Sequence, residues 1–321
     1  MAHTEQTNTE TTKRVGRAKR RRRTGHTRHR SGPSVRRALR RDAPSTVGLL
    51  VDAEDFAAMR RYRSFTFDDH AVYLQQVEGL LRSLAAQGTH TTVALFDPED
   101  YAEFCRETGL DPDGRASRSR FTAEVAAAGA TVAYQGQPID ALIPLLVSRA
   151  VRRATWEYAT MLLAGLGDCA DCGQDIGRAA FDRASHLLVR LLETAGPGTH
   201  HVVCSTPTKN EQLLAVLHIT GEGGGPARLD SSEGAEFTTV LAVGVALEMP
   251  GGVVLRTTVP HRPDRVHGWR LVRGGLVPLT AGEVFSAYCT DAETGEPVPP
   301  ESGVEYCAGF DLGADAPGEH H

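Results

Sequence analysis

The sequence predicts an α/β protein in which helices flank a parallel sheet, with a smaller β-rich unit after it and a basic tail before it. Three observations predict this fold class. Short apolar runs alternate with helical spacing from residue 47 onward, a glycine-rich break follows residue 220, and residues 1–43 hold 14 Lys and Arg against 3 Asp and Glu. Because the chain has 321 residues, 40% of them hydrophobic, it can bury more than one core. The expected units are a tail over 1–46, an α/β domain over 47–219, a β-rich unit over 226–310 and a frayed end over 311–321.

The N-terminal tail is too basic and too poor in apolar residues to form a core. It has no aromatic residue, and its most basic run consists of Arg20, Arg21, Arg22 and Arg23. We therefore expect a disordered tail. Such a tail is attracted to nucleic-acid phosphates by salt-sensitive electrostatics, with these four arginines as contacts. The same composition also suits a solvated arm, or an arm drawn to the acidic remainder of its own chain.

The α/β domain is predicted from five β-type runs and from the helices between them. The expected strands of the parallel sheet are 47–51, 91–96, 131–134, 160–166 and 201–204. Two intervening segments repeat apolar residues with the i, i+3, i+4, i+7 spacing of a helix buried on one side. Their apolar residues are Val77, Leu80, Leu81 and Leu84 in the first segment, and Ala184, Leu187, Leu188, Leu191 and Leu192 in the second.

The C-terminal unit follows the flexible break at 220–225, after which the apolar period approaches two. Glycine-containing turns at 250–252 and 274–275 predict two β-hairpins, with TTVLAVGVALEM at 238–249 as one of the flanking strands. Thr280 and Glu283 form a capping box for one short helix that ends near Tyr288. We expect this unit to offer a contact surface for a protein partner.

The compartment is predicted from what the sequence lacks. No apolar run approaches the roughly 18 residues of a membrane span, and the N-terminus has no apolar stretch of the secretory type. Six cysteines are too few for a disulfide framework in a chain of this length. We therefore expect a cytoplasmic protein without membrane contact.

Carboxylates follow each of the first four predicted strands. They are Asp52 and Asp55, Asp97, Asp140, and then Asp168 with Asp171. In a parallel sheet the residues that follow the strands lie at one edge of the sheet. Carboxylates held together there repel one another unless a cation lies among them. Oxygen ligands suit Mg²⁺ or Mn²⁺. Such ions bind substrate phosphates and activate water, which points to phosphodiester hydrolysis.

Three motifs in this order resemble the NYN group of PIN-like, metal-dependent ribonucleases, over about residues 47–218. They are VDAEDF at 51–56, QPIDALIPLL at 137–146 and LAGLGDCAD at 163–171. The resemblance implies a PIN-like parallel sheet flanked by helices, Mg²⁺ or Mn²⁺ as cofactor, and RNA as substrate. It also implies that Asp52, Asp140 and Asp168 are catalytic metal ligands. Asp55, at the family's asparagine position, and Asp171, a displaced version of its later acid, would be supporting residues of the same site. The chain departs from the family in having Ala53 for a glycine and Asp55 for an asparagine.

Three features of the sequence have more than one interpretation. Asp140 precedes a helical run and is either a ligand or a helix cap, or both. Asp97 stands before Pro98, which favours a helix N-cap. Cys169 and Cys172 have the spacing of one zinc knuckle, and the sequence leaves a structural zinc site, a redox dithiol and ordinary thiols as alternatives.

The leading functional prediction is therefore divalent-metal-dependent hydrolysis of RNA. The alternative is a non-catalytic nucleic-acid-binding or regulatory protein with a degenerate PIN-like fold, whose arginine tail supplies the affinity. A third is a protein-interaction scaffold. The first requires the carboxylates of Asp52, Asp140 and Asp168 to converge closely enough to share ions ~4 Å apart.

Overall fold

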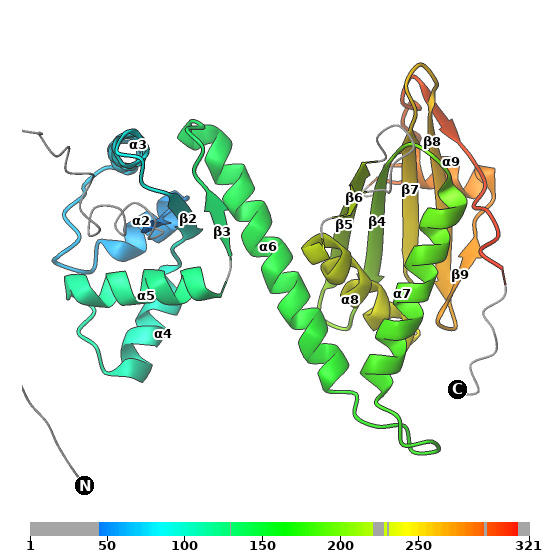
Figure 1. Cartoon of the computed structure of the whole chain (residues 1–321), viewed down its shortest axis with the longest axis horizontal. Helices are drawn as coiled ribbons and strands as arrows, with labels where there is room; N and C mark the ends of the chain where they lie inside the picture. Colours follow the sequence, from blue (N-terminus) through cyan, green and yellow to red (C-terminus); the bar gives the residue numbers. More distant parts are fainter. Residues whose placement is uncertain (1–44, 129, 221–227, 230, 292–293, 314–321) are drawn as a thin grey trace, which may run out of the picture.

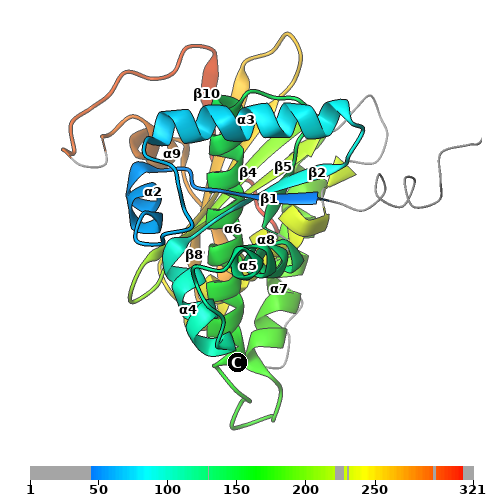
Figure 2. The same ribbon diagram turned by 90° about the vertical axis from the view of Figure 1, so that its left-hand side faces the viewer.

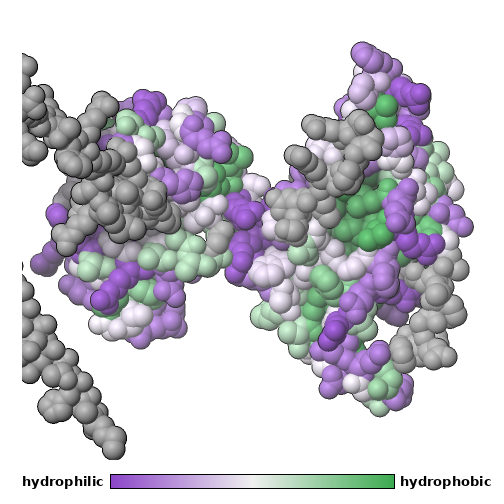
Figure 3. Space-filling view, in the orientation of Figure 1, coloured by the Kyte–Doolittle hydropathy of each residue, from purple (hydrophilic) through white to green (hydrophobic). Residues whose placement is uncertain are grey.

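The strands form two separate sheets with one long helix between them. The computed structural model describes residues 45–128, 130–220, 228–229, 231–291 and 294–313. Within these residues, one sheet has three strands and the other has seven, and helix α6 (Ile139–Ala164) runs from one to the other (Figure 1). In the space-filling view of Figure 3 the two units appear as separate lobes joined by a narrow waist. The predictions for the tail at 1–44, the break at 221–227 and the end beyond 313 lie outside the described residues.

The smaller sheet contains the first three predicted strands. β1 (Ser45–Leu49) pairs in parallel with β2 (Thr91–Leu95), so that Leu49 lies opposite Leu95. β3 (Thr131–Ala133) pairs with β2 antiparallel. The three strands are confirmed, but the sheet is not wholly parallel. After α4 and α5 the chain re-enters the sheet with Thr131 opposite Ala94, near the end of β2, so β3 runs back along β2.

Four helices surround this sheet: α2 (Ala53–Met59), α3 (His70–Ala86), α4 (Pro98–Thr108) and α5 (Arg115–Ala127). Figure 2 shows α3 on one side of β1 and β2, and α5 on the other. The predicted apolar stripe in α3 is confirmed by the burial of Val77 and Leu81, whereas Leu80 is about half exposed. Val77 and Leu81 form the first core together with Leu49, Val93 and residues of the other helices.

The larger sheet is assembled from the second half of the chain. Its strand order is β10-β8-β7-β4-β5-β6, and β9 pairs with β8. The pairings are antiparallel except that of β10 with β8. The elements in chain order are α7 (Ile176–Ala195), β4 (Thr199–Pro207), β5 (Gln212–Thr220), β6 (Arg228–Leu229), α8 (Ser231–Leu247), β7 (Gly252–Thr258), β8 (Asp264–Val272), β9 (Gly275–Pro278), α9 (Ala281–Tyr288) and β10 (Val304–Tyr306).

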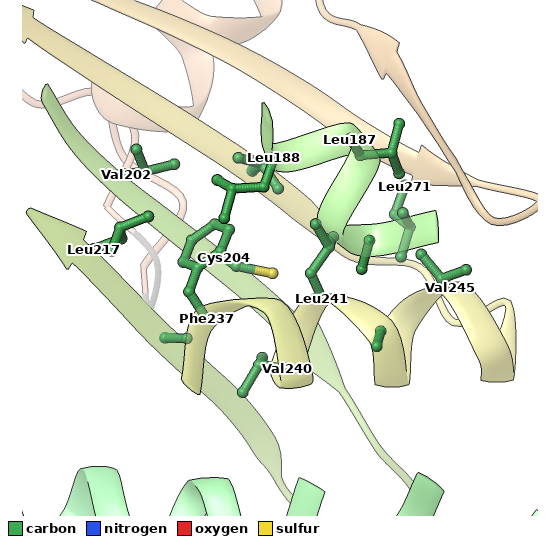
Figure 4. Close-up of a cluster of buried hydrophobic side chains, with 14 of the residues drawn as sticks. Leu187, Leu188, Val202, Cys204, Leu217, Phe237, Val240, Leu241, Val245 and Leu271 are labelled. Carbon is green, nitrogen blue, oxygen red and sulfur yellow. The ribbon is translucent and has the colours of Figure 1, made fainter. Parts of the chain in front are cut away.

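Helices α7 and α8 cover one face of the larger sheet and form the second core with it. Figure 4 shows Leu188 of α7 and Phe237 of α8 packed against Val202 and Leu217 of the strands. The predicted apolar stripe of α7 is confirmed, but it faces this antiparallel sheet rather than a parallel one.

Two predicted strands are helical, and these predictions were wrong. Residues 160–164 form the end of α6. Ala159 and Leu163, four residues apart, are buried on one face, which is the spacing of a helix and not of a strand. Most of the predicted strand at 238–249 lies in α8, whose apolar residues are buried on several sides between the sheet and its neighbours. A short apolar run of this kind does not distinguish a buried helix from a strand by periodicity alone. A single five-stranded parallel sheet is therefore not formed by the described residues.

The division predicted near 220–226 does not coincide with the sheets, because β4, which precedes it, pairs with β7, which follows it. Helix α6 joins the units instead. Its residues Ile139, Leu142 and Leu146 belong to the first core, and Ala159 with Leu163 belong to the second.

Smaller features of the C-terminal region were predicted correctly in part. The capping box of Thr280 and Glu283 is present, and α9 ends at Tyr288. The turn at 274–275 joins strands β8 and β9, whereas the turn at 250–252 joins α8 to β7 and is not a hairpin. Among the described residues no helix is both long and apolar enough to cross a bilayer.

Candidate functional site

Asp52 and Asp55 form a carboxylate pair where β1 ends. Asp52 is the N-cap of α2, and its Oδ1 accepts a hydrogen bond from the backbone N–H of Asp55 at 2.8 Å. Asp52 is exposed, whereas Asp55 is half-buried in the first turn of α2. The cap bond occupies one oxygen of Asp52 in a local role and brings the two side chains together.

Asp97 lies at the same edge, where β2 ends. Because β1 and β2 are parallel and in register, both strands deliver their following residues to one edge of the sheet. Asp97 is the predicted N-cap of α4, and its Oδ1 accepts from the N–H groups of Glu99 at 2.7 Å and Asp100 at 3.1 Å. Asp52, Asp55 and Asp97 therefore lie at the same edge of the smaller sheet.

The surroundings of Asp55 at this edge raise its pKa. Burial raises the pKa of Asp55 to about 6, and the negative charges of Asp52 and Asp97, together with a side-chain hydrogen bond to Asp52, act in the same direction. Burial also raises the pKa of Asp100, with smaller contributions from Asp97 and Glu99. A half-buried carboxylate with acidic neighbours is stabilised when a cation takes the place of its proton.

Arginines are frequent in the segment after α2 and at the start of α5. Arg61 donates from Nη2 to the carbonyl of Pro98 at 3.1 Å, which places its guanidinium beside the start of α4. Ser64 accepts at Oγ from Arg118 Nη1 at 2.6 Å, so the segment after α2 lies against the first turns of α5. The two segments carry six arginines, of which none forms an ion pair within the described part of the chain: Arg60, Arg61, Arg63, Arg115, Arg118 and Arg120. We call these six residues the arginine rim.

Asp140 does not join this cluster. The residue after β3, Tyr134, donates its N–H to Thr91 at the beginning of β2, so the chain leaves β3 at the opposite edge of the sheet. Asp140 then lies exposed in the first turn of α6, where it complements the helix dipole. The N-cap of α6 is Pro138, without a side-chain cap bond, so Asp140 is not the cap that the sequence allowed.

Asp168 and Asp171 lie in the loop between α6 and α7, at the other end of α6 from Asp140. The helix separates Asp140 from residue 164 by 24 residues, or roughly 36 Å at 1.5 Å per residue. Asp168 pairs with Asp175 in an isolated β-bridge, and Asp175 caps α7. The metal-ligand set of Asp52, Asp140 and Asp168 expected from the resemblance is therefore not assembled. No group of three or more His, Cys, Asp or Glu among the described residues could hold a metal ion.

Cys169 and Cys172 occupy the same loop as Asp168 and Asp171, and both thiols are free. Cys169 is half-buried and Cys172 is exposed. Because the described residues offer them no third ligand, a complete zinc site is not formed within the described part of one chain.

Sequence reasoning placed Asp97 at a strand end but interpreted it only as a cap, and it missed the arginine rim. Asp97 does cap α4, and it also raises the pKa of Asp55. The rim has a local sequence signal in the segments MRRYRS and GRASRSR at 59–64 and 114–120. Their adjacency depends on the contact between Ser64 and Arg118, which lie 54 residues apart.

One comparison finds a family model that matches part of this region. Residues 34–137 match a family described as a domain of unknown function (DUF8829), which is less than half of the 321 residues. The matched stretch contains β1, β2 and β3 with Asp52, Asp55 and Asp97, and it ends before α6. The chain matches no curated protein and no solved structure.

Proposed function

We propose that this protein hydrolyses phosphodiester bonds in RNA with a Mg²⁺ or Mn²⁺ ion held by Asp52 and Asp55. The observation that carries the proposal is the position of Asp55, half-buried beside Asp52 and at the same sheet edge as Asp97, where burial and these charges raise its pKa to about 6. Mg²⁺ suits this donor set, because it commonly binds through one or two protein carboxylates and completes its shell with water and substrate phosphates. A pair of carboxylates is therefore sufficient, and no third protein ligand is required.

The residues around the pair suit a phosphodiester substrate. Arg61 of the arginine rim lies next to the start of α4, the helix that Asp97 caps, and the other rim arginines add cationic side chains in the same unit. A planar guanidinium binds phosphate oxygens in bidentate fashion. The tail, with its excess of 11 positive charges over residues 1–43, adds long-range attraction for a polyanion. The resemblance to PIN-like ribonucleases favours RNA among such substrates.

Each residue then has a role in holding the reactants. Asp52 and Asp55 would hold the ion, and the backbone cap bond fixes Asp52 relative to α2. Asp97 adds negative charge nearby, which favours a cation over a proton at Asp55. The bound ion would supply Lewis acidity toward a phosphoryl oxygen and a more acidic bound water. The rim arginines orient the phosphate and offset its charge.

The test is cleavage of a labelled single-stranded RNA by the purified full chain, with and without Mn²⁺ or Mg²⁺. We expect metal-dependent cleavage that falls about 100-fold in Asp55→Asn and Asp52→Asn, at the upper end of the loss seen when a metal site is disturbed. Asp140→Asn and Asp168→Asn are the matched controls, since both acids are remote from the pair, and they should cleave as the unmodified chain does. Equal cleavage by all five proteins would refute the assignment.

A second candidate function is nucleic-acid binding without cleavage. The observation that favours it is the separation of Asp140 and Asp168 by the length of α6, which leaves only part of the expected acidic set at one edge. It predicts salt-sensitive RNA binding that persists in a chelator and is lost when residues 1–43 are deleted. Product formation in the presence of Mn²⁺ separates the two candidates directly.

A further inference from the structure

The loop between α6 and α7 forms a projecting tip of the larger unit. In Figures 1 and 2 it extends beyond the ends of both helices, at the bottom of each view. Most residues of 165–175 are exposed, and the two half-buried ones are Leu166 and Cys169. Cys169 and Cys172 therefore lie where another molecule can reach them.

Backbone hydrogen bonds close this tip into a tight knuckle. The N–H of Gly173 donates to the backbone carbonyl of Cys169 at 2.8 Å, and the N–H of Cys169 donates to the backbone carbonyl of Gln174 at 2.7 Å. Gly173 has a φ of +71°, a left-handed conformation that favours glycine and turns the chain back at once. A third bond, from Ile176 to Gly167 at 3.0 Å, ties the base of the loop. The two cysteines are thus held on a fixed turn.

The sulfur of Cys169 accepts hydrogen bonds from the backbone of its own turn. The backbone N–H groups of Cys172 and Asp171 donate to its sulfur, and these bonds, with a side-chain contact from Cys172, lower the pKa of Cys169. N–H groups directed at sulfur stabilise a negative charge that a metal ion can then use. Cys172 lies beside it, so the knuckle presents two sulfur ligands together.

The ligand set is half of a tetrahedral sulfur site. Two cysteines separated by two residues bind one Zn²⁺ ion, which requires four ligands in a structural site. The described residues add no third His, Cys, Asp or Glu to the two thiols. The missing half is available in an identical knuckle, because the exposed tip projects clear of both sheets and a second copy can approach it end to end.

We propose that Cys169 and Cys172 of two copies of this chain bind one Zn²⁺ ion between them and join the copies tip to tip. The site uses four thiolates, two from each chain. It stands apart from the carboxylate pair of the smaller unit, so its success or failure does not depend on the proposed hydrolysis.

The test is titration of the reduced, metal-free full chain with Zn²⁺, followed by metal analysis and light scattering. We expect one ion bound per two chains and a doubling of the mass. Co²⁺ in place of Zn²⁺ should give the intense visible absorption of a tetrahedral thiolate site. Cys169→Ser and Cys172→Ser should stay monomeric, whereas Cys307→Ser, a half-exposed cysteine elsewhere in the larger unit, should dimerise as the unmodified chain does.

Two results would overturn the proposal. One is the absence of zinc uptake by chains whose thiols are shown to be reduced. The other is uptake of one ion per chain without a change in mass, which would mean that the remaining ligands come from the same chain. Thermal unfolding of each serine variant checks that the fold is retained, which the exposure of the loop favours.

Discussion

Asp52 accepts a hydrogen bond at 2.8 Å from the backbone N–H of Asp55. The N-cap residue of α2 is therefore also the nearest negative neighbour of Asp55, whose pKa is raised to about 6. Helix capping and charge repulsion are thereby produced by one side chain. The cap stabilises the folded chain, and the repulsion creates a position that favours a cation.

The stability of the protein should depend on the ionisation of Asp55. Its pKa rises from 3.8 to about 6 on folding, so the folded state binds this proton more tightly. The resulting stabilisation is full below pH 3.8 and is lost as the pH rises through about 6. At pH 7 we expect Asp55→Asn to be more stable than the unmodified chain by about 1 kcal/mol, after discounting for partial exposure.

Thermal midpoints between pH 4 and pH 8 measure this effect. The two melting curves should converge toward acid and diverge above about pH 6. The exposed neighbour variant Glu54→Gln should follow the unmodified chain throughout. An Asp55→Asn protein that is less stable at pH 7 would contradict the expected sign.

Cation binding should require deprotonation of Asp55, because a protonated carboxyl group is a poor ligand. We expect the rise in melting temperature caused by Mn²⁺ to be small at pH 5 and to approach its full size above about pH 7, since affinity falls about tenfold per pH unit below the pKa. Asp55→Asn should show little rise at either pH. A rise of equal size at pH 5 and pH 7 would exclude Asp55 as a ligand.

The arginine rim should contribute to RNA affinity in proportion to the phosphates that it contacts. Arg63→Ala and Arg115→Ala change exposed side chains, so we expect stability to be retained. Each should weaken RNA binding and reduce the slope of log affinity against log salt by about 1. Binding isotherms between roughly 50 and 200 mM salt measure this slope. Arg262→Ala, an exposed arginine in the turn between β7 and β8, is the control and should leave the slope unchanged.

The junction between α6 and α8 should be sensitive to one ion-pair network. Arg152 of α6 donates to Glu233 at 2.8 Å and to Glu236 at 2.8 Å, and all three side chains are partly buried. Arg152→Ala leaves two carboxylates without their partner and should reduce the free energy of unfolding by about 2 kcal/mol. Arg106→Ala breaks the exposed pair with Glu103 and should reduce it by only about 0.5 kcal/mol. Chemical denaturation of both variants provides the comparison, and equal losses would contradict the role of burial.

The parts of the fold that could be predicted from the sequence are those set by local chemistry. The β-type runs before Asp52 and Asp97 are strands, Thr280 and Glu283 form their capping box, and the pairing of Asp52 with Asp55 needs only one helical turn. These features depend on residues a few positions apart, where spacing determines geometry.

The parts that could not be predicted depend on how elements pair. Asp140 and Asp168 were expected at the acidic edge because all strands were assumed to run in parallel, but β3 is antiparallel and the run at 160–166 continues α6. An apolar run such as that in α8 fits a strand or a buried helix, and only the surrounding sheet and helices decide between them. The position of a residue after a strand therefore predicts a site only when the strand direction is known.

The sharing of α6 between the two cores has a consequence for dissecting the protein. The stretch that matches a family ends at residue 137, just before Ile139, Leu142 and Leu146. A fragment ending at that residue would leave the smaller sheet with an open apolar face, and it should aggregate or melt early when produced alone. Extending the fragment through residue 147 restores those three side chains, so the autonomous unit is longer than the matched sequence indicates.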